Sequence, residues 1–297
     1  MSVGAHTQLS EGARAERRLG WLLCAPAFTI MVAVTGYPIV YAIYLSLQRY
    51  DLRFPSQAKF IGLSNYAAVL SSPYWWDAFV VTLVITLISV AIELVLGMAL
   101  AVVMHRTIFG RGTVRTSILI PYGIVTVVAA FSWRYAWEAD SGWIPHLLGL
   151  STDPLTTTFG SYVAVIIAEV WKTTPFMALL LMAGLALVPE DLQKAAKVDG
   201  ATAWQRFVRV TLPLMKPAIL VALLFRTLDA FRIFDNIFVL TSGGHNTGSV
   251  SILGYDNLFS AHNLGIGSAI SVLIFISVAI IAFLFIKGFG AAAPGRS

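Results

Sequence analysis

Residues 189–217 read PEDLQKAAKVDGATAWQRFVRVTLPLMKP, a polar and basic stretch between two long apolar runs. We therefore place it outside the lipid. Pro189 suits the first turn of a helix, where a missing N–H costs nothing, and Gly200 can take the left-handed conformation that ends one. Thr202 can cap a second short helix, which Pro213 and the proline four residues later would end. The stretch thus predicts a helix–glycine–helix hairpin at a membrane surface.

The composition of the chain is that of a polytopic membrane protein. Of its 297 residues 58% are hydrophobic and 12% are charged, whereas soluble domains carry about 25% charged residues. The single cysteine, Cys24, excludes an intramolecular disulfide and a Cys-based metal cluster. The histidines lack ligand-like spacing, and there is neither a Walker-type run nor a Gly-x-Ser-x-Gly elbow. We expect no metal site, no ATP hydrolysis and no enzymatic activity from this chain alone.

Six apolar runs predict six transmembrane helices, so the expected fold class is all-α. The first run, 21–47, is too long for the core of a cleaved signal peptide, which has about 7–15 residues, and Pro38 predicts a kink in it. Terminal tails are expected at residues 1–20 and 289–297, around a membrane domain spanning residues 21–288. The other predicted spans cover residues 78–104, 116–137, 161–188, 217–240 and 265–286.

Basic residues concentrate in alternate loops. The N-terminal tail holds three arginines, the loop between the second and third spans three, residues 189–217 five Lys and Arg, and the C-terminal tail two. The opposite loops hold three, with Arg134 near a membrane edge. The positive-inside rule predicts both termini and residues 189–217 on the cytoplasmic side of a bacterial inner membrane.

The spacing within 189–217 resembles the cytoplasmic signature loop of bacterial ABC-importer permeases, E-A-A-x(3)-G-x(9)-I-x-L-P. Lys194 replaces the usual Glu and Val210 the usual Ile, while Asp199-Gly200-Ala201 resembles the version of sugar importers. The resemblance implies that the loop lies in a groove of a separate ATPase and transmits its closure. An ordinary amphipathic connector is the alternative. The implied coupling residues are Lys194, Ala195, Ala196, Asp199, Gly200, Leu212 and Pro213.

Further segments resemble sugar-importer permeases. Residues 60–66 match a motif of the first outer loop, although a simple interfacial loop fits equally. Residues 171–176 match within the fourth span, where Glu169 and Lys172 could pair three residues apart. Residues 240–244 match after the fifth span, although His245 stands where the family often has Pro.

The fifth predicted span carries Arg226, Asp229, Arg232 and Asp235, each three residues after the last. Opposite charges at this spacing can pair along a helix. Each step of three residues lags about 60° around the helix axis, which puts Arg226 and Asp235 on opposite sides of the helix. We expect the ladder to face partner helices and a wet cavity, as a structural ion-pair lattice or a substrate site.

Sugars are bound by hydrogen bonds to hydroxyl groups and by aromatic rings stacked on the sugar ring. By resemblance, the fifth span lines the translocation path, although a wall residue of these types, taken singly, more often serves packing than substrate binding. The expected path residues are Tyr122, Trp171, Arg226, Asp229, Phe231, Arg232, Phe234, Asp235 and Asn236.

Over about residues 20–290 the chain resembles maltose-type permeases, which implies a type I ABC-importer permease fold. It also implies a second, non-identical permease, an outer sugar-binding protein and an ATPase dimer that binds ATP and Mg, while this chain binds no cofactor. Residues 245–264 could reach the binding protein or lie on the membrane as an amphipathic helix. Overall similarity favours an oligosaccharide, such as the disaccharide trehalose, although no residue identifies the sugar.

Two other functions remain open from the residues alone. An ion-coupled secondary transporter could use Glu93, Glu169 or Asp229 as its titrating group. A structural subunit could merely anchor other proteins, in which case neutralising the charged ladder would leave transport intact.

Overall fold

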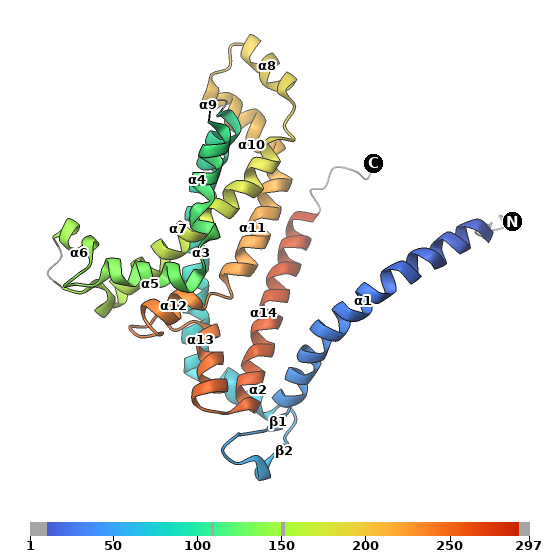
Figure 1. Cartoon of the computed structure of the whole chain (residues 1–297), viewed down its shortest axis with the longest axis vertical. Helices are drawn as coiled ribbons and strands as arrows, with labels where there is room; N and C mark the ends of the chain where they lie inside the picture. The colour runs from blue at the N-terminus through green and yellow to red at the C-terminus, as the bar shows by residue number, and fades with distance from the viewer. Residues whose placement is uncertain (1–10, 108–109, 150–151, 291–297) are drawn as a thin grey trace.

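The computed structural model describes residues 11–107, 110–149 and 152–290. These residues form a helical bundle with one small hairpin at its lower end (Figure 1). The predicted tails fall partly on residues 1–10 and 291–297, which lie outside the described residues. Within the predicted N-terminal tail, helix α1 already begins at Glu11.

Four described helices are long and apolar enough to cross a membrane, and up to six spans result if each bent pair is one span. One pair joins α4 to α5 with an 87° bend, and the other joins residues 203–214 to α11 with a 68° bend. The predicted fifth span is broken at residues 231–234, between α11 and α12. The bounds are α1 Glu11–Ser46, α3 Pro73–Arg106, α4 Arg111–Gly123, α5 Thr126–Trp137, α7 Thr158–Leu185, α11 Lys216–Ala230, α12 Asp235–Leu240 and α14 Leu264–Gly290.

The centre of the bundle is the packing of α3 against α7. A Cβ on Gly97 of α3 would lie only 2.8 Å from Cγ of Met177 on α7. Small residues allow such close approach of membrane helices. Buried Met177 and Leu181 of α7 also pack with Ala222 of α11, which makes one apolar core of the three helices.

Helix α1 stands away from the rest of the bundle (Figure 1). It packs against α14, but none of its most apolar window is buried. Pro26 and Pro38 both lie inside this continuous helix. The apolar surface of α1 therefore requires lipid or another protein to cover it.

The lower end of the bundle holds a hairpin and a short helix that fasten α1. Asn65 is buried and donates from Nδ2 to the carbonyls of Ser46 and Gln48, at 2.8 Å each. In the same turn region the Arg53 guanidinium, which donates to Asp51, lowers the pKa of that carboxyl to about 2. The elements here are β1 Gln48–Arg49, η1 Pro55–Gln57, β2 Lys59–Phe60 and α2 Ser64–Ser71.

Short elements connect the long helices at both ends. The segment 190–214 lies at the end of the bundle opposite the hairpin (Figure 1). The remaining bounds are α6 Trp143–Leu148, η2 Pro154–Thr156, α8 Glu190–Val198, α9 Ala203–Arg206, the π-helical turn η3 Phe207–Thr211, α10 Leu212–Leu214, α13 Val250–Tyr255 and the π-helical turn η4 Asp256–Ser260.

Candidate functional site

The segment 189–217 forms the predicted pair of helices around a glycine. Gly200 has a φ of +79°, a conformation that favours glycine and ends α8. Thr202 caps α9, because its hydroxyl accepts from the N–H of Gln205 while the Gln205 side chain accepts from the N–H of Thr202. The glycine stop and the threonine cap predicted from the sequence are therefore confirmed.

The prolines of this segment act differently from the prediction. Pro213 and Pro217 do not end the second helix; they lie in the first turns of α10 and α11. The chain passes from α9 through η3 into these helices with αR conformations at the junctions. Proline is tolerated at a helix start because its N–H has no partner there, so it marks a restart here rather than a stop.

Helix α8 exposes most of its surface. It has no buried residue, and its apolar Val198 is 88% exposed. Lys194 lies 3.4 Å from Glu190 and 3.7 Å from Asp191 in exposed ion pairs, which contribute little to stability. The helix is thus held at the bundle's edge with its surface available to another molecule.

A second polar group lies inside the bundle, around the fully buried Arg226 of α11. Its guanidinium donates to Glu93 of α3 at 2.5 and 3.0 Å, to Glu169 of α7 at 2.5 Å and to Asp229 at 2.9 Å. Asn236 of α12 donates to the second oxygen of Glu169 at 2.5 Å. One arginine therefore joins α3, α7 and α11, and Glu169 extends the network to α12. We call these five residues the Arg226 cluster.

The predicted charged ladder forms only at its first step. Arg226 pairs with Asp229, but α11 ends at Ala230. No ion pair of Arg232 or Asp235 occurs among the described residues, because the break removes the helical spacing. The expected pair of Glu169 and Lys172 is wrong: Glu169 binds Arg226, and Lys172 donates to the carbonyls of Tyr122 and Ile124 at 2.9 and 2.5 Å.

A cavity of about 600 Å³ lies where two spans are interrupted, at the α4–α5 bend and the α11–α12 break. Lys172 reaches across it to the carbonyls at the end of α4. Asp229, which is 70% exposed at its side chain, links this cavity to the Arg226 cluster. Six of the nine predicted path residues line it, namely Tyr122, Asp229, Arg232, Phe234, Asp235 and Asn236.

The other three predicted path residues do not line this cavity. Arg226 is enclosed by its carboxylates, and Phe231 is fully buried against Phe79, with ring centroids 5.7 Å apart. Trp171 packs on Trp133 at 5.8 Å. These side chains were assigned to the wall from their positions in the sequence, but their contacts with residues of other helices hold them away from this cavity.

Three polar residues that line the cavity are missing from the path residues predicted from the sequence. Glu169, Lys172 and Thr173 line the cavity, and the Thr173 hydroxyl lies 2.8 Å from an oxygen of Glu93. The available signal was an ionisable residue inside an apolar run, which marks a functional or paired group by default. No group of His, Cys, Asp or Glu within the described residues could hold a metal ion.

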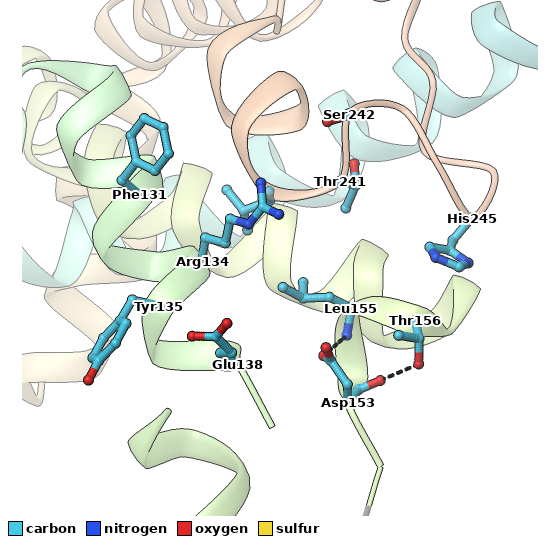
Figure 2. A pocket seen from close by; sticks show the side chains of 11 residues that line it. Phe131, Arg134, Tyr135, Glu138, Asp153, Leu155, Thr156, Thr241, Ser242 and His245 are labelled. Carbon is cyan, nitrogen blue, oxygen red and sulfur yellow. Dashed lines mark hydrogen bonds between the residues drawn. The ribbon is translucent and has the colours of Figure 1, made fainter. Parts of the chain in front are cut away.

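A polar pocket of about 450 Å³ lies between α5, η2 and the loop after α12 (Figure 2). Arg134 donates to the carbonyl of Val239 at 2.9 Å. Asp153 accepts from the N–H of Leu155 at 2.9 Å. His245 has a φ of +51°, which the proline ring forbids, so the loop differs from relatives that carry Pro here.

Comparisons with known proteins agree with the predicted resemblance. Residues 60–291 match the family described as "Binding-protein-dependent transport system inner membrane component". The chain is 66% identical to the trehalose transport system permease protein SugA of Mycobacterium tuberculosis, over 95% of this chain and 92% of that protein. It is 40% identical to the trehalose/maltose transport system permease protein MalF of Thermococcus litoralis, over 92% of this chain and 94% of that protein.

A solved structure shows the same fold. A chain in the crystal structure of a bacterial ABC transporter that imports the acidic polysaccharide alginate superimposes with a TM-score of 0.80 at 20% identity, covering 96% of this chain and 100% of that chain. The all-α type I permease fold predicted from the sequence is therefore confirmed. Because the family match covers most of the chain, the protein belongs to the binding-protein-dependent transport system inner membrane components, and it is a transport subunit rather than an enzyme.

Proposed function

We propose that the chain is one of two permease subunits in an ATP-driven importer of a disaccharide, with trehalose as the first candidate. The observation that carries the proposal is the 66% identity to a trehalose permease over almost the whole chain. The polar cavity at the two helix breaks supports it. Transporters place substrate sites at discontinuous helices near the bilayer midplane.

The cavity offers the chemistry that a sugar requires. Arg232 donates hydrogen bonds and Asp235 accepts them, and neither has an ion pair among the described residues. The rings of Tyr122 and Phe234 supply apolar faces. Asn236 is held in place by Glu169, which is fixed in turn by Arg226. Arg226 therefore acts as a positioning residue behind the wall, where it holds Glu169 and Asp229, which line the cavity.

The segment 189–217 is proposed to couple this cavity to a separate ATPase dimer, which binds ATP and Mg. The exposed α8 supplies the docking surface, and Gly200 and Leu212-Pro213 fix its angle to α11. The distribution of Lys and Arg supports a cytoplasmic location of this segment and of both termini. Closure of the ATPase would tilt α11, whose break lines the cavity.

Two further partners follow from the same proposal. A second, homologous permease would enclose the path, and the exposed apolar length of α1 offers a surface for it. A sugar-binding protein would dock at the end of the bundle that faces away from the cytoplasm. This end holds residues 245–264 and the polar pocket between α5, η2 and the loop after α12. That loop contains α13 and η4, which pack against α14, so its free surface is limited.

The ion-coupled alternative finds less support. Two of its three candidate groups, Glu93 and Glu169, are bound to Arg226 and are at most 9% exposed at their side chains. The third, Asp229, also pairs with Arg226 but is 70% exposed. Family membership also favours a transport system with separate binding-protein and energy-supplying subunits.

Uptake of radiolabelled trehalose by a strain that lacks this gene tests the proposal. We expect uptake to be lost, to return with the intact gene, and to persist in the presence of an uncoupler while ATP is maintained. An excess of unlabelled trehalose should compete better than maltose. Unchanged uptake in the deletion strain would overturn the trehalose assignment, and collapse with the uncoupler at constant ATP would favour ion coupling.

A further inference from the structure

An apolar groove of about 590 Å³ lies beside residues 189–217, which we call the coupling segment, at the end of the bundle opposite the hairpin. One wall is the last half of α3, the other is formed by α9, η3 and α10, and Ile219 of α11 also lines it. Ten of the eleven lining residues are apolar and none is acidic. They are Leu94, Val95, Met98, Ala99, Val102, Arg106, Ala203, Trp204, Phe207, Leu212 and Ile219.

The aromatic side chains of α9 and η3 line this groove. The rings of Trp204 and Phe207 stack with centroids 5.8 Å apart, and both line the groove. Trp204 is nevertheless 71% exposed. Tryptophan favours the membrane–water interface, where its apolar body meets polar headgroups. These rings therefore occupy the level at which a lipid headgroup meets its chains.

The one charged lining residue is Arg106, in the last turn of α3. Among the described residues its exposed side chain takes part in no ion pair and no hydrogen bond. A guanidinium binds phosphate well because two of its N–H groups can donate in parallel. The groove thus has an apolar body and a single cationic end.

We propose that this groove binds an anionic phospholipid, with one acyl chain along α3 and the headgroup phosphate on Arg106. Basic pockets between membrane helices on the cytoplasmic side are suited to anionic headgroups. The groove also continues the lipid-facing surface of α3, where Val95 is 69% exposed. A bilayer lipid can therefore enter from the side without any rearrangement of the bundle.

The lipid would join two parts that move relative to each other. Leu94, Met98 and Ile219 pack on the core shared by α3, α7 and α11, whereas Trp204 and Phe207 belong to the coupling segment. An occupied groove would thus support the coupling segment against α3. The inference uses the proposed function only for its assignment of this end to the cytoplasm.

Photolabelling of the full-length chain, purified with its copurifying subunits in nanodiscs, tests the proposal. Phosphatidylglycerol and phosphatidylcholine carrying a diazirine on one acyl chain are compared, and the labelled peptides are mapped by mass spectrometry. We expect phosphatidylglycerol to label residues 94–102 and 203–207 about fivefold more than phosphatidylcholine, the ratio expected for one basic residue near a membrane surface.

Two variants and two matched controls locate the site. Ala99→Phe should fill the exposed groove and abolish labelling, whereas Val103→Phe, on an exposed part of α3 outside the groove, should not. Arg106→Gln should remove the preference for phosphatidylglycerol, whereas Arg209→Gln, an exposed arginine outside the groove, should keep it.

Three results would overturn the proposal: equal labelling by the two lipids, labelling that survives Ala99→Phe, or a photoreactive residue at position 99 that captures a protein subunit instead of lipid. Because labelling is read without sugar uptake, these results are independent of whether trehalose is the cargo.

Discussion

The Arg226 cluster and the coupling segment are the two polar regions of an apolar chain, and they differ in where their partners lie. Every charged group around Arg226 finds its partner within the chain, at 2.5 to 3.0 Å. The exposed α8 has no buried residue, and its ion pairs are weak surface pairs. The charged groups of the first region are paired within one chain; under the proposed function, the second region acquires its partner from another protein.

This difference assigns different tasks to similar residues. A buried charge that loses its partner is costly, so the Arg226 cluster fixes α3, α7 and α11 relative to one another. An exposed helix contributes little to stability, so α8 can be shaped by what it binds. Variants in the first region should therefore affect folding, and variants in the second should affect transport.

The largest effect is expected for Arg226→Met. Glu93 and Glu169 would remain buried without a counter-charge, which costs about 3–5 kcal/mol. We expect a large drop in the amount of folded protein and in the thermal midpoint, measured by fluorescence-detected size-exclusion chromatography. Arg232→Met, at an exposed arginine without an ion pair, serves as the control and should leave the midpoint nearly unchanged. Equal stability of the two variants would contradict the role of the cluster.

Gly200→Asp should abolish transport without preventing insertion. A non-glycine residue at φ +79° costs about 1–2 kcal/mol and changes the angle between α8 and α9. We expect normal protein levels and continued ATP hydrolysis by the complex, with sugar uptake at background. Gly110→Asp is matched, because Gly110 also has a positive φ of +65° and open space around it, yet lies outside the coupling segment. Normal uptake by Gly200→Asp, or equal loss with Gly110→Asp, would refute the coupling assignment.

A wall residue of the cavity should give an intermediate effect. Asp235→Ala removes an acceptor that lines the cavity, and a hydrogen bond to a charged group contributes about 1.5–3 kcal/mol. The KM for sugar uptake should rise at least about tenfold with little change in thermal midpoint. Trp171→Phe tests a predicted path residue that does not line the cavity, and its KM should stay near the wild-type value. A larger rise in KM for Trp171→Phe than for Asp235→Ala would show that the sugar path runs along Trp171 instead of this cavity.

Lys194→Glu should have the smallest effect. Among the residues that the structure describes, Lys194 pairs with exposed Glu190 and Asp191, and exposed pairs contribute about 0.2–1 kcal/mol. A glutamate there would meet like charges, with a penalty of similar size. We expect a thermal midpoint within a few degrees of the wild type and sustained sugar uptake. A marked loss of uptake by this variant would show that the lysine has a specific partner.

Much of the fold could be predicted because the apolar runs are long and separated by polar loops. The predicted spans overlap α3, α7 and α14 to within a few residues at most ends. The break between α11 and α12 was missed because residues 231–234 contain neither Gly nor Pro. The bend between α4 and α5 follows Gly123, whose neighbouring Pro121 suggested the start of a span rather than its middle.

The candidate site was predictable where local spacing decides it. The glycine stop and the Thr202 cap depend on residues a few positions apart, and both were found. The partners of Arg226 lie 133 and 57 positions away, so only the packing of three helices reveals them. The same packing turned Phe231 and Trp171 away from the cavity, against the expectation from the sequence.

The central claim is that α8 binds a separate ATPase while the Arg226 cluster needs no partner. Its most direct test is a photo-crosslinking residue at Val198, which is 88% exposed, with a second position at exposed Trp143 of α6 as the control. After gentle detergent purification from the native membrane, the account predicts that Val198 alone crosslinks to an ATPase subunit, with a second permease in the same preparation. A chain that emerges alone or as a homo-oligomer, with no crosslink from Val198 under conditions that preserve other complexes, would contradict it.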